Sequence, residues 1–432
     1  MAEKKISFIE AVSIAVGTMI GASIFSVFGL GASIAEQDLP WALLLSGFFA
    51  LAVAYSYARL GAKITSNAGA IAFILEGIGD SLVTGVLSLL MWMTYVVSIS
   101  LFAKGFAGYL LPLLHLKLTA LHRALVEVGV VVAFMALNFF GSKMVGEAEK
   151  IIVLIKVTIL GIFVAVGMFG IDADKVRPAF DGAHLGGLVH ASLLFFLSYM
   201  GFGLITNASE NIKQPERTVP RAIYTSIGIV MAVYVLVALV ATGNLTTQEM
   251  VQAKENALAV ATRPFMGRAG FWLISIGALF SISSALNATL YGGANISYAL
   301  AKHGELPEFF ERKIWFHAME GLYLTAGLGI AFALLFDMNG IAAITSTVIT
   351  VIYLFVLVSH LKLIDQVGGK RILVVFNLVV LSAVFAGLLF YQWETQLTAL
   401  LGTGAVIVGA FLVELVFRFV RRRSFKTDAP GA

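Results

Sequence analysis

The stretch Gly17-Thr18-Met19-Ile20-Gly21-Ala22-Ser23-Ile24-Phe25 lies inside a long apolar run near the start of the chain, and Gly29 and Gly31 follow it. Small residues therefore crowd the middle of a segment in which a lipid-facing helix would carry bulky side chains. The stretch Ser198-Tyr-Met-Gly201-Phe-Gly203 repeats this pattern near the middle of the chain. One such cluster could serve either close helix packing or a break in the helix, but a pair of them favours two broken helices.

The composition of the 432 residues is that of a membrane protein. Hydrophobic residues make up 59% and charged residues 12%, whereas soluble domains average ~45–50% and ~25%. There is too little polar surface to cover a water-soluble body of this size. This excludes a soluble enzyme, a nucleic-acid-binding protein and a disordered scaffold. The chain has no cysteine, which excludes disulfides and thiolate sites.

Apolar runs long enough to cross a bilayer, about 20 residues each, recur along the whole chain. They are continuous rather than alternating, which predicts helices instead of barrel strands. We expect an all-α polytopic membrane protein with 12 transmembrane helices, at residues 8–34, 40–60, 82–112, 124–142, 149–170, 187–212, 221–243, 270–300, 320–338, 341–360, 371–391 and 397–419.

The basic residues are spread unevenly over the loops between these runs. With a cytoplasmic amino terminus, 20 of the 29 Lys and Arg residues lie inside and seven outside, the seven being Lys117, Arg123, Lys175, Arg177, Lys254, Arg263 and Arg268. The positive-inside rule then predicts that both termini are cytoplasmic, with Arg421 to Arg423 as an interface anchor. No cleavable signal is expected, because the first apolar run follows Ser7 directly. The expected location is the plasma membrane.

The two glycine-rich runs are the first and the sixth, so five spans separate equivalent positions. Because five is odd, the two halves would have opposite orientations, which is typical of a secondary transporter with its site near the midplane. We predict a ten-helix transport core at residues 1–360, with repeats at about 8–170 and 187–360. Residues 361–432 would form two peripheral helices, without a buried charge, and a basic cytoplasmic tail.

Breaks in two helices expose backbone groups that a polar solute can satisfy. The half-helix that begins near Ser23 presents free N–H groups suited to a carboxylate, and the carbonyls before it suit an ammonium. A small zwitterion answers both requirements. Neither break carries an acidic side chain, which argues against a dicationic polyamine as the main cargo.

Three motifs resemble those of the amino acid–polyamine–organocation transporters, in the order and orientation of that family. They are Gly17 to Phe25; Tyr199 to Gly203 followed by Glu210-Asn-Ile-Lys-Gln-Pro-Glu-Arg-Thr-Val-Pro-Arg221; and Ser283 to Asn287 through Tyr298 to Pro307. The similarity covers nearly the whole chain and is greatest to the archaeal proton-coupled amino acid transporters.

The resemblance implies a LeuT-type fold with a 5+5 inverted repeat, importing amino acids by alternating access. It implies that the carboxylate meets N–H groups of Gly21, Ala22 and Ser23, and that Phe202 gates or walls the pocket. The amine would meet the carbonyls of Met19, Leu197, Ser198 and Met200. The chain departs from the family pattern at Ser23, where glycine is usual, and at Gly203 and Asn211, where acidic residues often stand. Cationic cargo is therefore less expected.

Two lysines fall within predicted spans. Lys156 lies about seven residues into the fifth span, ~10 Å deep, where a charge costs ~2.5–3.5 kcal/mol. Burial favours the uncharged amine, so this side chain could gain and lose a proton. The resemblance implies that it replaces the sodium ion of related transporters, reaching the Gly17 carbonyl and the hydroxyl of Ser281 or Ser284. For Lys104 we expect snorkelling or pairing with Glu127.

These observations predict proton-coupled symport of small neutral amino acids, driven by the proton gradient without a cofactor or metal. The expected partners are the amino acid, protons and the lipid bilayer but no nucleic acid, and the protein would be a monomer or a weak oligomer. An amino acid exchanger or an amino acid/polyamine antiporter of the same fold remains the alternative. An enzyme is not expected, since the spans contain no nucleophile and base motif.

Overall fold

The computed structural model describes residues 5–66, 68–116, 119–138, 143–179, 182–302 and 320–420. Regular structure in these ranges is helical, apart from one bridge between Ile6 and Ile212. Within the described ranges, ten helical stretches are long and apolar enough to cross a membrane, and Phe8–Met19 and Gly321–Leu335 are shorter apolar helices. This confirms the predicted all-helical membrane protein. The basic anchor Arg421 to Arg423 lies outside the described residues, as does the His303 to Pro307 part of the third motif.

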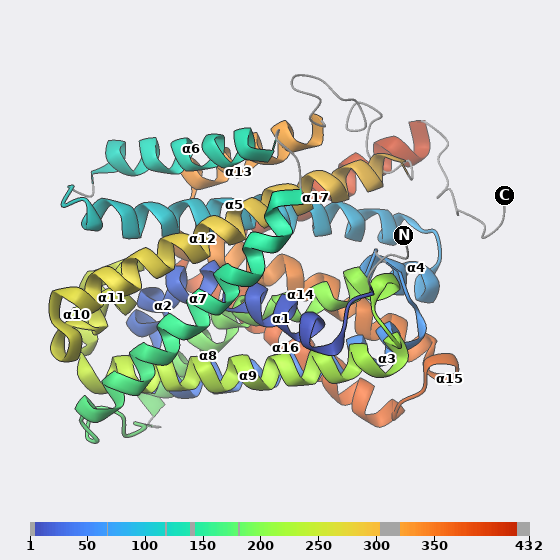
Figure 1. Cartoon of the computed structure of the whole chain (residues 1–432). Helices are drawn as coiled ribbons and strands as arrows, with labels where there is room; N and C mark the ends of the chain where they lie inside the picture. Colours follow the sequence, from blue (N-terminus) through green and yellow to red (C-terminus); the bar gives the residue numbers. More distant parts are fainter. Residues whose placement is uncertain are drawn as a thin grey trace.

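The long helices run along one direction and form a bundle (Figure 1). Two short helices, α10 (Thr247–Ala253) and α11 (Ala257–Ala261), lie at one end of the bundle, and α4 (Ala70–Ile78) and α15 (Ile364–Val367) lie at the other. We call α10 and α11 together the lid, and their end of the bundle the lid end. The bundle consists of α1 (Phe8–Met19), α2 (Ala22–Ala35), α3 (Leu39–Lys63), α5 (Leu82–Leu113), α6 (Ala120–Leu137), α7 (Lys143–Gly167), α8 (Gly182–Phe195), α9 (Pro215–Asn244), α12 (Arg263–Lys302), α13 (Glu320–Leu335), α14 (Met338–Lys362), α16 (Arg371–Thr395) and α17 (Leu397–Val420).

Helix starts follow local capping rules. Ser7 and Glu10 form a capping box at the start of α1, in which the Glu10 amide donates to the Ser7 hydroxyl (3.4 Å) and the Ser7 amide donates to the Glu10 carboxylate (2.9 Å). Thr246 and Glu249 repeat this arrangement at α10. Hydrogen bonds from the Thr246 amide and hydroxyl lower the pKa of the Glu249 carboxyl. The capping box of Thr246 and Glu249 therefore fixes the residue at which α10 begins.

The first predicted span is interrupted. The helix α1 ends at Met19, and the chain resumes helical structure at Ala22, after Gly21 with φ −85° and ψ −135°. In the other glycine-rich span the α-helix α8 ends at Phe195, and the chain continues as a 3₁₀ helix, η4 (Phe196–Asn211). Runs of 3₁₀ helix this long are uncommon, and in the middle of a span they mark a hinge or a functional segment.

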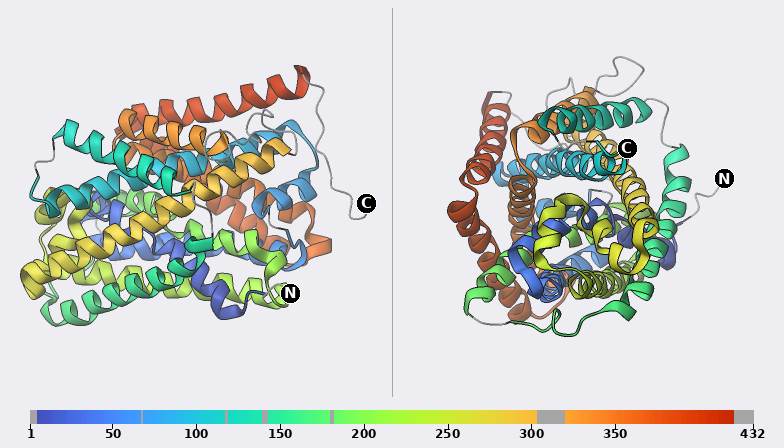
Figure 2. Two further views of the ribbon diagram at one scale, coloured as in Figure 1. Left: turned by 45° about the horizontal axis from the view of Figure 1, so that its top comes forward. Right: turned by 90° about the vertical axis from the view of Figure 1, so that its left-hand side faces the viewer.

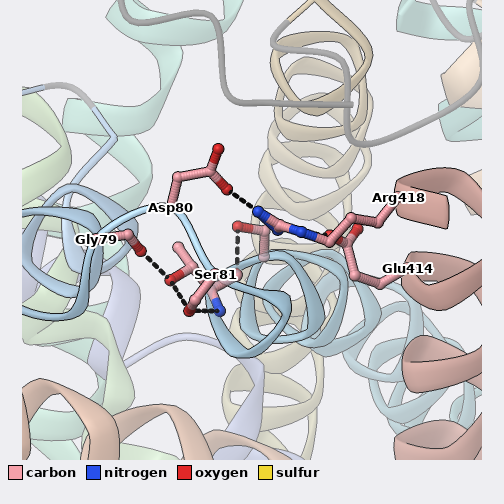
Figure 3. A network of polar contacts seen from close by, with 7 residues as sticks. Gly79, Asp80, Ser81, Glu414 and Arg418 are labelled. Atoms are coloured by element: carbon pink, nitrogen blue, oxygen red, sulfur yellow. Dashed lines mark hydrogen bonds and ion pairs between the residues drawn. The ribbon is translucent and has the colours of Figure 1, made fainter. Parts of the chain in front are cut away.

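The helices α16 and α17 lie at the rim of the bundle when it is viewed along its axis (Figure 2, right). The expectation that the last two spans hold no buried charge is wrong, because Glu414 of α17 is only 4% exposed. Its carboxylate accepts from Arg418 (3.5 Å), and Arg418 also pairs with Asp80, which lies just before α5 (Figure 3). Charge pairing allows this acid to be buried on a lipid-facing helix.

Candidate functional site

The break between α1 and α2 has backbone carbonyls with a partner on α12. The Ser281 hydroxyl lies 3.3 Å from the carbonyl oxygen of Ile20 and 3.2 Å from that of Gly21, in position to donate a hydrogen bond to either. A broken helix in a membrane needs such partners, because lipid supplies no donor. Ser281, one of the two hydroxyls predicted near Lys156, therefore holds the break itself against α12.

Tyr234 of α9 joins the two interrupted segments. Its fully buried hydroxyl lies within hydrogen-bond distance of the Met19 carbonyl oxygen and 3.2 Å from the Ser198 carbonyl oxygen. Its ring meets that of Tyr199 edge-on, with centroids 5.3 Å apart. The single O–H of Tyr234 can thus donate to a carbonyl of either break. Of the other carbonyls predicted for the substrate amine, that of Met200 lies 3.5 Å from the Tyr353 hydroxyl.

The two interrupted segments also touch through their backbones. A Cβ atom built on Gly201 would lie 2.8 Å from the amide nitrogen of Met19, so only glycine allows this approach without a shift. Gly17 has a similar function beside α7, because a Cβ there would lie 2.4 Å from a methyl group of Val153. The glycines that suggested broken helices are therefore required at least partly for close packing.

Lys156 of α7 extends toward α1 close to the contact between Gly17 and Val153, and it is only 1% exposed. The ammonium donates a hydrogen bond to the carbonyl of Gly17, which lies in the last turn of α1 before the break. A charge-assisted hydrogen bond of this kind is among the stronger ones in proteins. The contact tethers α7 to the first half of the interrupted span.

A cavity of about 240 Å³ lies beside both breaks. Four predicted substrate contacts line it, namely Ser23, Leu197, Ser198 and Met200, and so do Lys156 and Gly17. Polar groups from other helices complete the wall, including Thr94, Tyr95 and Ser98 of α5, Asn207 of η4, Thr289 of α12 and Thr345 of α14. Among the described residues of this wall, Lys156 alone carries a formal charge, since the rest are neutral.

Other predicted contacts lie elsewhere around the breaks. Met19 directs its carbonyl to Tyr234, and Gly21 directs its own to Ser281. Phe202 is fully buried and stacks on Tyr353, with ring centroids 5.9 Å apart. Ser284, the other predicted hydroxyl, is 8% exposed on α12. Ala22 begins α2, and its backbone belongs to the predicted carboxylate cradle.

Aromatic rings close one side of the cavity. Tyr57 of α3 and Tyr353 of α14 line it, with ring centroids 5.5 Å apart in an edge-on contact. Phe202 packs against both rings. The predicted wall residue Phe202 therefore lies next to two tyrosines that are themselves lining residues.

Ion pairs hold the lid end of the bundle. Glu255, just before α11, accepts two hydrogen bonds from the Arg123 guanidinium of α6, at 2.9 and 3.1 Å. The predicted pairing of Lys104 with Glu127 is confirmed, with the ammonium nitrogen 3.5 Å from a carboxylate oxygen. Two-point contact between an arginine and a carboxylate fixes relative orientation as well as distance. The lid is therefore anchored on α6.

Three tyrosines of the site, Tyr57, Tyr234 and Tyr353, have no motif that marks them in the sequence. Each is an ordinary aromatic residue of an apolar run, and its contacts join helices that are far apart along the chain. A buried tyrosine hydroxyl requires a hydrogen-bond partner. A tyrosine inside an apolar run is therefore the one feature of the sequence that indicates such contacts.

Comparison with known proteins gives consistent matches over most of the chain. The model of the family described as "Amino acid permease" matches residues 6–417. An uncharacterized protein of Methanocaldococcus jannaschii is 58% identical over 98% of both chains. The inner membrane transport protein YbaT of Escherichia coli is 29% identical over 98% of this chain and 97% of its own. The methylthioribose transporter of Bacillus subtilis is 25% identical over 72% and 69% of the two chains.

Proposed function

Since the chain belongs to the amino acid permease family, whose members are transporters and not enzymes, we propose that it is a proton-coupled symporter of small neutral amino acids. It works by alternating access in the plasma membrane, with 12 transmembrane helices and both termini in the cytoplasm. The observation that carries the proposal is the buried ammonium of Lys156 in the cavity wall, bonded to the Gly17 carbonyl at the end of α1.

The position of Lys156 supports proton coupling. Lysine is a titratable side chain, and Lys156 lies both in the cavity wall and against the first half of the interrupted span. Loss of the proton removes the charge-assisted hydrogen bond to Gly17, so α1 becomes freer to move relative to α7. Protonation of Lys156 thus controls how tightly α1 is attached to α7. Because the break after α1 borders the proposed substrate site, a movement of α1 alters that site.

The cavity supports a small neutral substrate. Its volume of about 240 Å³ lies below the ~300–1,000 Å³ of drug-sized ligand pockets. The described lining has hydroxyl and amide groups but no carboxylate that would pair with a second positive charge. The start of α2 at Ala22 to Ser23 would receive the carboxylate of a zwitterion, and the carbonyls of Leu197, Ser198 and Met200 would receive the ammonium.

Contact between the two interrupted segments supports an inverted-repeat core. In such transporters each repeat contributes a broken helix to one central site. Here Gly201 approaches Met19 closely, and Tyr234 reaches carbonyls of both segments. We assign residues 1–360 to the core and the rim helices α16 and α17 to the periphery.

Transport in proteoliposomes tests this function. Thermal stability against the twenty amino acids and methylthioribose, at two pH values, selects the ligand, because binding to the folded state raises stability. The labelled ligand is then offered to vesicles with no internal amino acid and an acidic exterior. A symporter accumulates it, and dissipating the pH gradient abolishes accumulation. Uptake that requires an internal amino acid would instead identify an exchanger.

A further inference from the structure

A second cavity, of about 440 Å³, opens at the lid end between the end of α5 and the start of α12. It is separate from the candidate substrate site. Its lining is Pro112, His115, Arg263, Gly267, Arg268, Phe271 and Trp272. Two arginines and a histidine therefore face one small volume.

The two arginines lack an acidic partner among the residues that the structure describes. Arg263 lies over the ring of Phe271, with its guanidinium carbon 4.9 Å from the ring centroid, and both arginines are exposed. Other arginines at this end differ, since Arg123 pairs with Glu255 and Arg177 pairs with Asp174. The cavity consequently carries positive charge that no carboxylate of the described chain neutralises.

A backbone kink brings the arginines together. Residues five apart in a regular α-helix lie about 140° apart around its axis, so Arg263 and Arg268 would face different directions. Gly267 interrupts the helix with φ +58° and ψ −144°, a conformation that glycine adopts readily. Both arginines then line the same cavity. The kink therefore concentrates positive charge at one site.

An apolar stripe continues from this cavity along α12. Trp272, Ile276 and Phe280 are four residues apart, so they share one face of the helix. They are 41%, 41% and 55% exposed, respectively. In a membrane protein such a face meets acyl chains, and a tryptophan at its end is typical of the level of the headgroups. The cationic cavity thus lies at the headgroup end of an apolar face that acyl chains would contact.

We propose that this cavity binds the phosphate headgroup of an anionic membrane lipid, with an acyl chain along Trp272, Ile276 and Phe280. Arginine guanidinium groups suit phosphate oxygens, and basic pockets between membrane helices are suited to anionic headgroups. The stripe argues for a lipid rather than free phosphate, because a soluble anion gains nothing from it. The site adjoins α11, so a bound lipid braces the junction of the lid with α12.

The test uses purified full-length protein in detergent, with phosphatidylglycerol or phosphatidylcholine of identical chains as the probe and thermal stability as the readout. We expect phosphatidylglycerol to stabilise the protein more strongly. The double variant Arg263→Gln/Arg268→Gln should bind it about tenfold more weakly or worse, as expected for loss of charged hydrogen bonds. The control Lys175→Gln/Arg177→Gln removes the same charge at the same end and should leave binding unchanged.

Three results would overturn the proposal. Equal stabilisation by the two lipids removes the need for an anionic headgroup. Equal weakening in the double variant and its control shows a diffuse charge effect instead of a site. Stabilisation by inorganic phosphate alone, at the same phosphate concentration, shows an anion site without a lipid. If the double variant folds poorly, Arg268→Gln gives the same comparison, since Arg268 makes no ion pair with the described chain.

Discussion

The ammonium of Lys156 donates a hydrogen bond to the carbonyl of Gly17, two residues before α1 ends at Met19. The two residues are 139 positions apart, and Gly17 allows the contact because any side chain there would strike Val153. A titratable group is therefore attached directly to the backbone of an interrupted helix. The proposed coupling of proton and substrate rests on this relationship.

Tyr234→Phe should weaken both the fold and transport. It removes the hydroxyl that serves the Met19 and Ser198 carbonyls, and a buried acceptor left without a donor costs about 1–3 kcal/mol. Thermal unfolding and initial uptake rates measure the two effects. Tyr199→Phe is the matched control, since its hydroxyl donates to Leu43 (3.0 Å), away from the breaks. It should lose stability but keep its transport rate. Equal transport loss in both variants would contradict a specific role for Tyr234.

Gly29→Ala should displace the lid. A Cβ at Gly29 would lie 1.9 Å from the carbonyl oxygen of Lys254, so backbone atoms must move. Overpacking of this kind costs about 1–3 kcal/mol. We expect faster amide hydrogen exchange in α10 and α11 and a lower melting temperature. Gly228→Ala on α9 is the control, because nothing lies within 4 Å of a Cβ there. An unchanged exchange rate in α10 and α11 would show that Gly29 does not position the lid.

Arg418→Gln should loosen α17 from α5. The guanidinium contacts both Asp80 and the buried Glu414 (Figure 3), and hydrogen bonds to charged groups contribute about 1.5–3 kcal/mol. Thermal unfolding should show a loss of this order. Adding Glu414→Gln should restore much of it, because the buried carboxylate is then gone. A double variant less stable than Arg418→Gln alone would mean that Glu414 is stabilised by other contacts.

Features set by local sequence were predictable, and contacts set by packing were not. Glycines inside an apolar run pointed to the break after Met19, and lysines in such runs pointed to Lys156 and to the Lys104–Glu127 pair. Tyr234 contacts Met19 across 215 residues, a relationship that nothing in its own segment indicates. Glu414 was expected to be exposed although its partner Arg418 lies four residues along the same helix, because its burial depends on the packing of α17 beside α5, which only the fold sets. The kink at Gly267 was not predicted either.

The most direct test of the account is proton-driven uptake by the Lys156→Ala variant in proteoliposomes, beside wild type and Lys156→Arg. Arginine keeps the positive charge but does not release its proton. We expect both variants to lose accumulation driven by a pH gradient, while thermal stabilisation by the amino acid persists at least in Lys156→Arg. If the Lys156→Ala variant still concentrates the labelled amino acid when a pH gradient is imposed, Lys156 is not the coupling group and the account is wrong.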